Sequence, residues 1–90
     1  MKISIITATY NSSKTISSAL ESVSYQDYPD IEHLIVDGAS TDHTVEIVKS
    51  FQKDHPQIVL HSEKDKGIYD ALNKGVQLAT GDVIGVLLFQ

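Results

Sequence analysis

Two polar segments combine side chains that could recognise a nucleotide. Tyr10 follows an apolar run and could stack on a base, and its neighbours Thr9 and Asn11 could donate hydrogen bonds to the same ligand. Asp37 ends a second apolar run, where a carboxylate could accept from a base N–H or ribose hydroxyls while Gly38 lets the chain turn. The alternatives stay open, because the tyrosine could pack on a following helix and the polar groups could satisfy their own turns.

A third polar segment, Asp65, Lys66 and Gly67, precedes a predicted helix. A cation beside a helix N-terminus could bind an anion such as phosphate. The alternative is a solvated charged loop. Within the helix, Asp70 and Lys74 are one turn apart and could pair at the surface.

Composition excludes several other classes of function. The chain has no cysteine, which removes thiolate metal sites, disulfides and cysteine nucleophiles, and fits a cytoplasmic protein. The net charge of -5 argues against free nucleic acid as a partner, and no apolar run is long enough to span a bilayer. Neither the phosphate-loop nor the dinucleotide glycine pattern occurs. No metal-ligand spacing connects the four histidines, which we expect to be structural or exposed: His33, His43, His55 and His61.

The three segments lie between predicted strands and helices. Apolar runs predict strands over residues 2–7, 32–37, 57–61 and 82–89, and apolar residues at helical spacing predict helices between them. We expect Asn11 or Ser12 to cap the first helix and Gly81 to close the third. This alternation predicts an α/β fold with a parallel sheet in strand order 3-2-1-4 and helices on its faces. The polar segments should then meet at the carboxyl edge of the sheet.

Taken in order, three stretches resemble one family. They are ISIITATYN at residues 3–11, VDGASTDHT at 36–44 and KGIYDALNKGVQLATGD at 66–82. Each is similar to a motif of bacterial family-2 glycosyltransferases, and together they span nearly the whole chain. The resemblance implies the Rossmann-like nucleotide-binding half of a GT-A fold, with residues 1–90 forming one truncated domain that binds a nucleotide sugar.

The resemblance also implies roles for single residues. Tyr10 would lie near the face of the base, Asp37 would bond the uracil or ribose edge, and Lys66 would lie near the diphosphate. Asp70 and Asn73 would border the site. The residues that we expect to bind the nucleotide are Thr9, Tyr10, Asp37, Asp65, Lys66, Gly67 and Asp70.

The sequence departs from the family pattern in three places. Gly38 stands where many members have a second aspartate, and Leu72 stands where many have an arginine. The fourth strand, VIGVLLFQ, is not followed by the acidic cluster that holds a divalent metal in the family. The full-length enzyme is expected to need Mn²⁺ or Mg²⁺, whose ligands are absent here, so the chain alone is expected to be inactive.

For the full-length enzyme, the resemblance implies transfer of a sugar from a nucleotide-diphospho-sugar, with a UDP-sugar as the expected donor, in surface polysaccharide synthesis. The alternative is a non-catalytic module that binds a nucleotide or assembles with itself. We also expect a homo-oligomer, because residues 83–89 are apolar and no charge or proline protects them as an edge strand.

Overall fold

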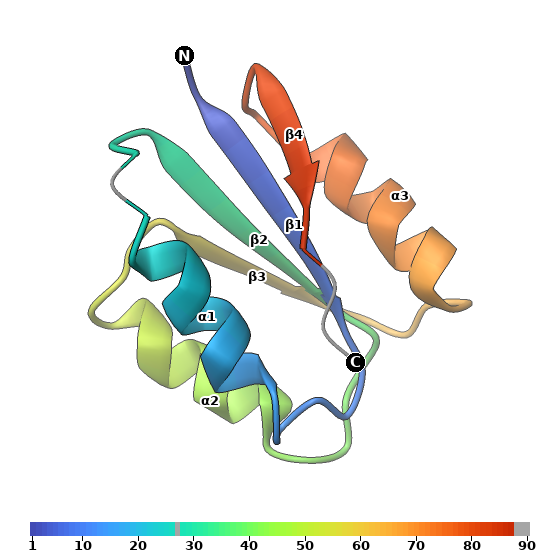
Figure 1. Cartoon of the computed structure of the whole chain (residues 1–90). Helices are drawn as coiled ribbons and strands as arrows, with labels where there is room; N and C mark the ends of the chain where they lie inside the picture. The colour runs from blue at the N-terminus through green and yellow to red at the C-terminus, as the bar shows by residue number, and fades with distance from the viewer. Residues whose placement is uncertain (27, 88–90) are drawn as a thin grey trace.

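The computed structural model describes residues 1–26 and 28–87, in which strands and helices alternate along the chain (Figure 1). This order confirms the predicted arrangement. The elements are β1 (Ile3–Thr9), α1 (Ile16–Ser24), β2 (Ile31–Asp37), α2 (Thr44–Gln52), β3 (Ile58–Ser62), α3 (Ile68–Leu78) and β4 (Val83–Val86).

The four strands form one parallel sheet in the order β3-β2-β1-β4, which confirms the predicted topology. Thr9 is paired with Asp37, and Asp37 is paired with Ser62. The loops that follow β1, β2 and β3 therefore leave the sheet at its carboxyl edge, side by side.

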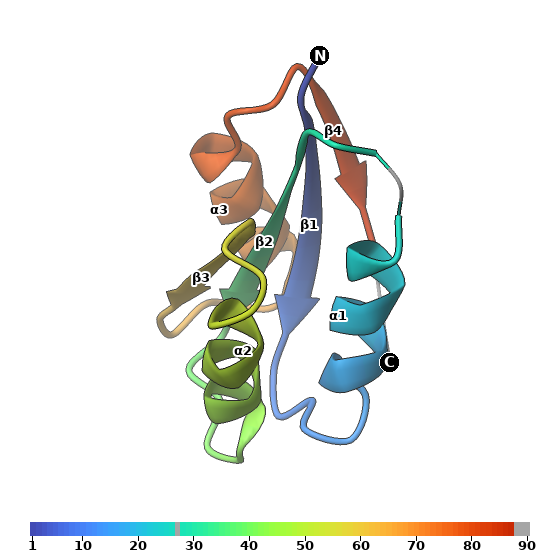
Figure 2. The ribbon, with the colours of Figure 1, turned by 90° about the vertical axis from the view of Figure 1, so that its left-hand side faces the viewer.

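Helices cover both faces of the sheet, with α1 and α2 on one face and α3 on the other (Figures 1 and 2). One core joins the two helices to the sheet, with Leu20, Val48 and Ile35 all fully buried. The second core lies under α3. A methyl group on Gly75 would come within 2.5 Å of an Ile6 side-chain carbon, so glycine lets α3 approach the sheet closely.

A closed polar cluster occupies the amino edge of the sheet. Glu32 accepts hydrogen bonds from the Ser4 hydroxyl at 2.7 Å and from the Thr80 backbone N–H at 2.7 Å, and Lys2 Nζ lies 3.4 Å from its other oxygen. Burial alone would raise the pKa of the Glu32 carboxyl, but the bonds from Thr80, Ser4 and Lys2 outweigh it and lower the pKa to about 2. The cluster fixes the loop between α3 and β4 to the sheet.

The predicted helix caps were wrong. Helix α1 begins after Thr15 with no side-chain cap, and the Ser12 backbone carbonyl accepts the Thr15 and Ile16 N–H groups instead. Asn11 is unavailable as a cap because its side chain bonds to another loop. Helix α3 ends at Leu78, and Gly81 lies beyond it, packed on Ser4.

The fourth strand covers Val83–Val86, within the longer predicted range 82–89, whose last two residues lie outside the described part of the chain. No helix among the described residues is long and apolar enough to cross a membrane.

Burial shows the environment of two of the four histidines, which were predicted to be structural or exposed. His33 is buried at the centre of β2, with its Nε2 atom 2.8 Å from the Thr7 hydroxyl. His43 is exposed beside Glu46 at the start of α2. Both positions agree with the prediction of structural or exposed histidines.

Candidate functional site

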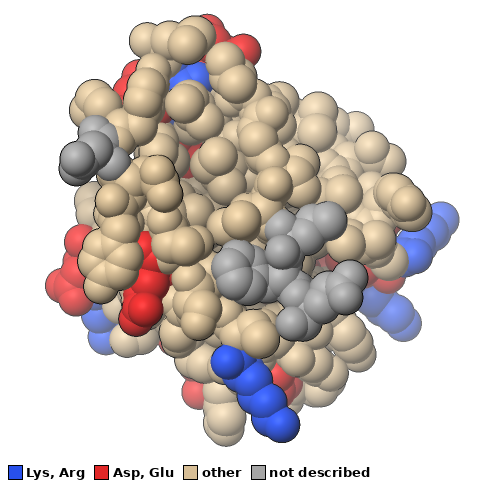
Figure 3. Space-filling model, in the orientation of Figure 1, with Lys and Arg blue, Asp and Glu red and all other residues tan. Residues whose placement is uncertain are grey.

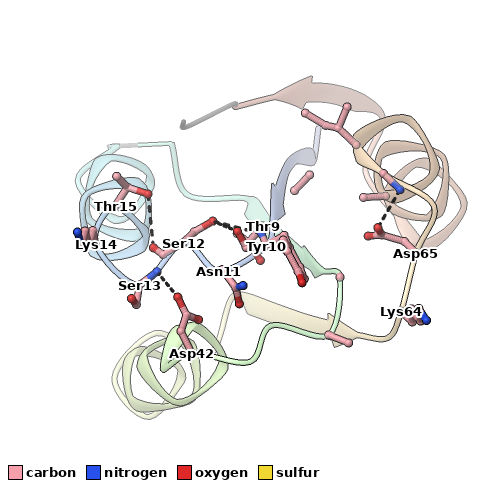
Figure 4. A pocket seen from close by; sticks show the side chains of 16 residues that line it. Thr9, Tyr10, Asn11, Ser12, Ser13, Lys14, Thr15, Asp42, Lys64 and Asp65 are labelled. Atoms are coloured by element: carbon pink, nitrogen blue, oxygen red, sulfur yellow. Dashed lines mark hydrogen bonds between the residues drawn. The ribbon is translucent and has the colours of Figure 1, made fainter.

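A hollow of about 980 Å³ opens at the carboxyl edge of the sheet (Figure 4). The loops after β1, β2 and β3 and the start of α3 all contribute to its wall. Of the predicted binding residues, four line it: Thr9, Tyr10, Asp65 and Gly67. The remaining three, Asp37, Lys66 and Asp70, are not among the lining residues.

Asp37 lies behind the wall of the hollow and holds the loops together. It is fully buried, and both of its carboxylate oxygens are used within the protein. Oδ1 accepts from the Thr9 hydroxyl at 2.6 Å and the Ser40 hydroxyl at 2.6 Å, while Oδ2 accepts from the Ser40 N–H at 2.8 Å and the Ser62 hydroxyl at 2.9 Å. Asp37 thus connects the carboxyl ends of β1, β2 and β3.

The loop that presents Tyr10 is fastened to the loop after β2. Asn11 adopts a left-handed conformation with φ of 48°, and its side-chain carbonyl accepts the Thr41 N–H at 2.8 Å. In return, the Ser40 hydroxyl accepts the Asn11 N–H at 2.8 Å. Tyr10 itself is 62% exposed, so its ring is available to a ligand while its backbone is held.

Asp42 closes the base of this loop pair. Its carboxylate accepts from the Thr44 N–H and hydroxyl and from the Ser13 N–H. The Thr44 hydroxyl, with the two N–H groups, lowers the pKa of Asp42 to about 2, so this group stays charged at neutral pH.

In the segment before α3, where we expect an anion site, two backbone N–H groups are bonded within the protein. The Gly67 N–H donates to Asp65 Oδ1 at 3.0 Å, and the Lys66 N–H donates to Asp70 Oδ2 at 2.9 Å. Two backbone donors that could have met a phosphate are thus bonded to carboxylates. Lys74 supports the segment by donating to the Lys64 carbonyl at 3.2 Å.

Sequence reasoning missed several residues of the wall, including both of its lysines. Lys14 and Lys64 lie on opposite sides of the hollow (Figure 4). Lys64 lies only two residues from the predicted Lys66. A charged loop with two lysines does not by itself reveal which of them faces a cavity, because that depends on how the loop turns.

The described residues provide no ligand set for a divalent metal. Across residues 1–26 and 28–87, no group of three or more His, Asp or Glu side chains is placed to hold an ion. Asp37 and Asp42 are both bonded to protein donors, which leaves them unsuited to the task.

Comparison with known proteins gives a family. The sequence profile of glycosyl transferase family 2 matches residues 4–87. A PGL/p-HBAD biosynthesis glycosyltransferase of Mycobacterium bovis is 40% identical over 79 residues, which cover 87% of this chain and 31% of that protein. A poly-beta-1,6-N-acetyl-D-glucosamine synthase of Staphylococcus epidermidis is 35% identical over 82 residues, which cover 91% of this chain and 20% of that protein. The chain therefore spans less than a third of the length of these relatives.

Solved structures agree in fold. S. aureus TarS 1-349, in complex with UDP-GlcNAc, superposes with a TM-score of 0.89 and 30% identity over 98% of this chain and 26% of that one. A mannosyltransferase from Pyrobaculum calidifontis, in complex with GDP-Man and Mn²⁺, gives a TM-score of 0.85 and 34% identity over 92% of this chain and 26% of that one. The matches to the family profile, to curated relatives and to solved structures agree, and the chain belongs to glycosyl transferase family 2.

Proposed function

We propose that the hollow at the carboxyl edge binds the nucleotide of a nucleotide-diphospho-sugar. The observation that carries this proposal is the composition of the wall, in which the exposed ring of Tyr10 and the carboxylate of Asp65 line one hollow in a family-2 chain. An aromatic ring can stack on a base, and a carboxylate can accept from its N–H groups or from ribose.

The predicted residues take different parts in this proposal. Thr9, Tyr10, Asp65 and Gly67 contact the nucleotide directly. Asp37 acts as a positioning residue, because its oxygens already accept from the loops that form the wall.

The diphosphate needs positive charge, which the lysines of the loop before α3 can supply. Lys64 lines the hollow, and the exposed Lys66 lies two residues further on. The Asp70 carboxylate holds the backbone of this loop through the Lys66 N–H. We therefore assign Asp70 to the support of the phosphate side and not to contact with the base.

For the full-length protein we propose transfer of a sugar to an acceptor in surface polysaccharide synthesis at the cytoplasmic side, with residues 1–90 as the nucleotide-binding domain. The similarity to the synthase of S. epidermidis supports a role in polysaccharide synthesis, and the similarity to TarS in complex with UDP-GlcNAc supports a UDP-sugar as the donor. The mannosyltransferase complex with Mn²⁺ supports a divalent metal in the full-length enzyme. The 90-residue chain alone is expected to bind nucleotide without transferring sugar. These relatives favour a transferase over a non-catalytic module.

Isothermal titration calorimetry with uridine diphosphate tests the binding proposal. We expect saturable binding by the 90-residue chain, and little change when Mn²⁺ is added, because the described residues hold no metal ligand set. Tyr10→Ala should weaken binding about tenfold through lost stacking. Tyr25→Ala is the matched control, since Tyr25 is 80% exposed at the end of α1 and lies outside the hollow. Absence of heat with both uridine and guanosine diphosphates would refute the proposal.

We also propose self-association through β4. Val83, Ile84 and Val86 of this edge strand are 42% to 51% exposed, and the described strand contains no charged residue. In Figure 3, the visible surface over β4 is mostly tan, without Lys, Arg, Asp or Glu side chains. Sedimentation velocity should give a dimer or larger species that Val86→Lys converts to monomer, and a monomer at tens of micromolar before substitution would contradict it.

A further inference from the structure

Gly38 lies directly against the carboxylate of Asp65. A methyl group at position 38 would lie 2.9 Å from Asp65 Oδ2 and 3.1 Å from Oδ1, closer than carbon and oxygen normally approach. Among the described glycines only Gly67 has a positive φ, so the backbone at position 38 is one that alanine can adopt. The obstacle to a side chain at position 38 is therefore the end of the Asp65 side chain, which can move.

The Asp65 carboxylate is held by a hydrogen bond and occupies space left open at Gly38. Oδ1 accepts the Gly67 N–H at 3.0 Å, and the carboxylate lies where a side chain at position 38 would need room. Within residues 1–26 and 28–87, Oδ2 receives no hydrogen bond. This distinguishes Asp65 from Asp37 and Asp42, whose oxygens both accept protein donors.

We infer that Gly38 is the positioning residue for Asp65, because the missing side chain at position 38 leaves open the place from which the Asp65 carboxylate accepts from the nucleoside. The inference rests on the proposed function of the hollow. The donor to Oδ2 is a base N–H or a ribose hydroxyl, because both present a polar hydrogen to a carboxylate. An aspartate at position 38 would place a second negative charge in the space that Asp65 occupies, and repulsion would displace one of the two.

A double-mutant cycle tests the pair, with calorimetry of uridine diphosphate binding to the 90-residue chain. Asp65→Ala removes the acceptor and Gly38→Ala displaces it, so each should weaken binding about tenfold or more. Gly38→Ala/Asp65→Ala should bind no more weakly than Asp65→Ala alone, because the added methyl group then has nothing to displace. Asp54→Ala, in the turn after α2 at the opposite edge of the sheet, removes the same charge and should leave affinity unchanged.

The ligand and the free protein provide further readouts. If the ribose is the donor, 2′,3′-dideoxyuridine diphosphate should bind equally to the unsubstituted chain and Asp65→Ala. If the base is the donor, N3-methyluridine diphosphate should do so. In the free protein, Gly38→Ala should shift the NMR signal of the Gly67 amide, which bonds to Asp65. If the losses of affinity in the double-mutant cycle were additive, or if neither substitution changed binding, the inference about Gly38 and Asp65 would be wrong while the proposed function stood. If the unsubstituted chain bound no nucleotide, both the inference and the proposed function would be wrong.

Discussion

The two ends of β2 each bury a carboxylate, but the surface around them differs. At the amino end, Glu32 draws the loop before β4 onto the sheet so tightly that a methyl group on Gly81 would lie 2.6 Å from the Ser4 hydroxyl. At the carboxyl end, Asp37 accepts donors from Thr9, Ser40 and Ser62, yet the loops it holds enclose a hollow of about 980 Å³.

The difference between the two edges shows that a residue can support the loops of a site without contacting the ligand. A buried carboxylate whose oxygens are all bonded stabilises the fold at either edge, and it has little left to offer a ligand. At the carboxyl edge a second carboxylate, Asp65, lines the hollow, and its Oδ2 receives no hydrogen bond from the part of the chain that the structure describes. We therefore expect ligand binding at the carboxyl edge, where Asp37 holds the loops together and Asp65 offers an acceptor to the ligand.

The largest effect is expected at the amino edge, from Glu32→Ala. The substitution leaves the buried Ser4 hydroxyl and the Thr80 N–H without their acceptor, which should cost about 3 to 4 kcal/mol of unfolding free energy. Urea denaturation should detect it, and the folded fraction should still bind uridine diphosphate. Glu46→Ala, on the exposed side of α2, should change stability by about 0.5 kcal/mol or less. If folded Glu32→Ala did not bind uridine diphosphate, the amino edge would contribute to ligand binding as well as to stability.

The middle of β2 should give the chain a pH-dependent stability. Burial lowers the pKa of His33 from 6.5 to about 4. The unfolded chain therefore takes up a proton between these values when the folded chain does not, and stability should fall by up to about 3 kcal/mol as pH drops from 6.5 to 4. The contribution of Glu32 is lost only at lower pH, between 4.5 and about 2. In His33→Gln, the urea midpoint should depend less on pH across this range than it does in the unsubstituted chain. If both chains showed the same dependence on pH, a group other than His33 would cause the effect.

Asp37→Asn should affect stability and binding together. The amide keeps one acceptor oxygen and puts an NH₂ donor in place of the other, so two of the four donors from Thr9, Ser40 and Ser62 lose their acceptor, at a cost of about 2 kcal/mol. The loops around the hollow should loosen, so affinity for uridine diphosphate should fall as well. Asp65→Asn, by contrast, should lower affinity with little change in the denaturation midpoint. If both variants lowered only affinity, Asp37 would be a direct ligand.

The smallest expected effect concerns Asn11. Alanine at this position must adopt a left-handed φ near 48° and loses the bond to Thr41, which should cost about 1 to 2 kcal/mol. Asn11→Gly loses the bond but tolerates the conformation, so it should be the more stable variant by thermal denaturation. Equal stability of the two would mean that backbone strain at position 11 is negligible.

The fold could be predicted from the sequence because its signals are local and repeated. Four apolar runs at strand spacing alternate with three patterns at helical spacing, and parallel crossovers then restrict the strand order. The caps could not be predicted in the same way. Asn11 is a good capping residue by type, but Thr41, distant in sequence, takes up its side chain.

The site was predictable only to the level of its loops. The sequence places Asp37 and Asp65 at the correct edge, but nothing local distinguishes a carboxylate with four protein donors from one with a free oxygen. That distinction arises from the Thr9, Ser40 and Ser62 hydroxyls, which come from three separate segments. The same limit explains why Lys64 was missed while its neighbour Lys66 was selected.

Binding of a nucleotide at the carboxyl edge of this sheet can be tested by titrating uridine diphosphate into the ¹⁵N-labelled chain and following each amide by NMR. We expect shifts for Thr9, Gly38 and Gly67, which line the hollow, and none for Ser4 or Gly81 at the amino edge. Shifts confined to the amino edge, or no shifts at millimolar nucleotide, would contradict it.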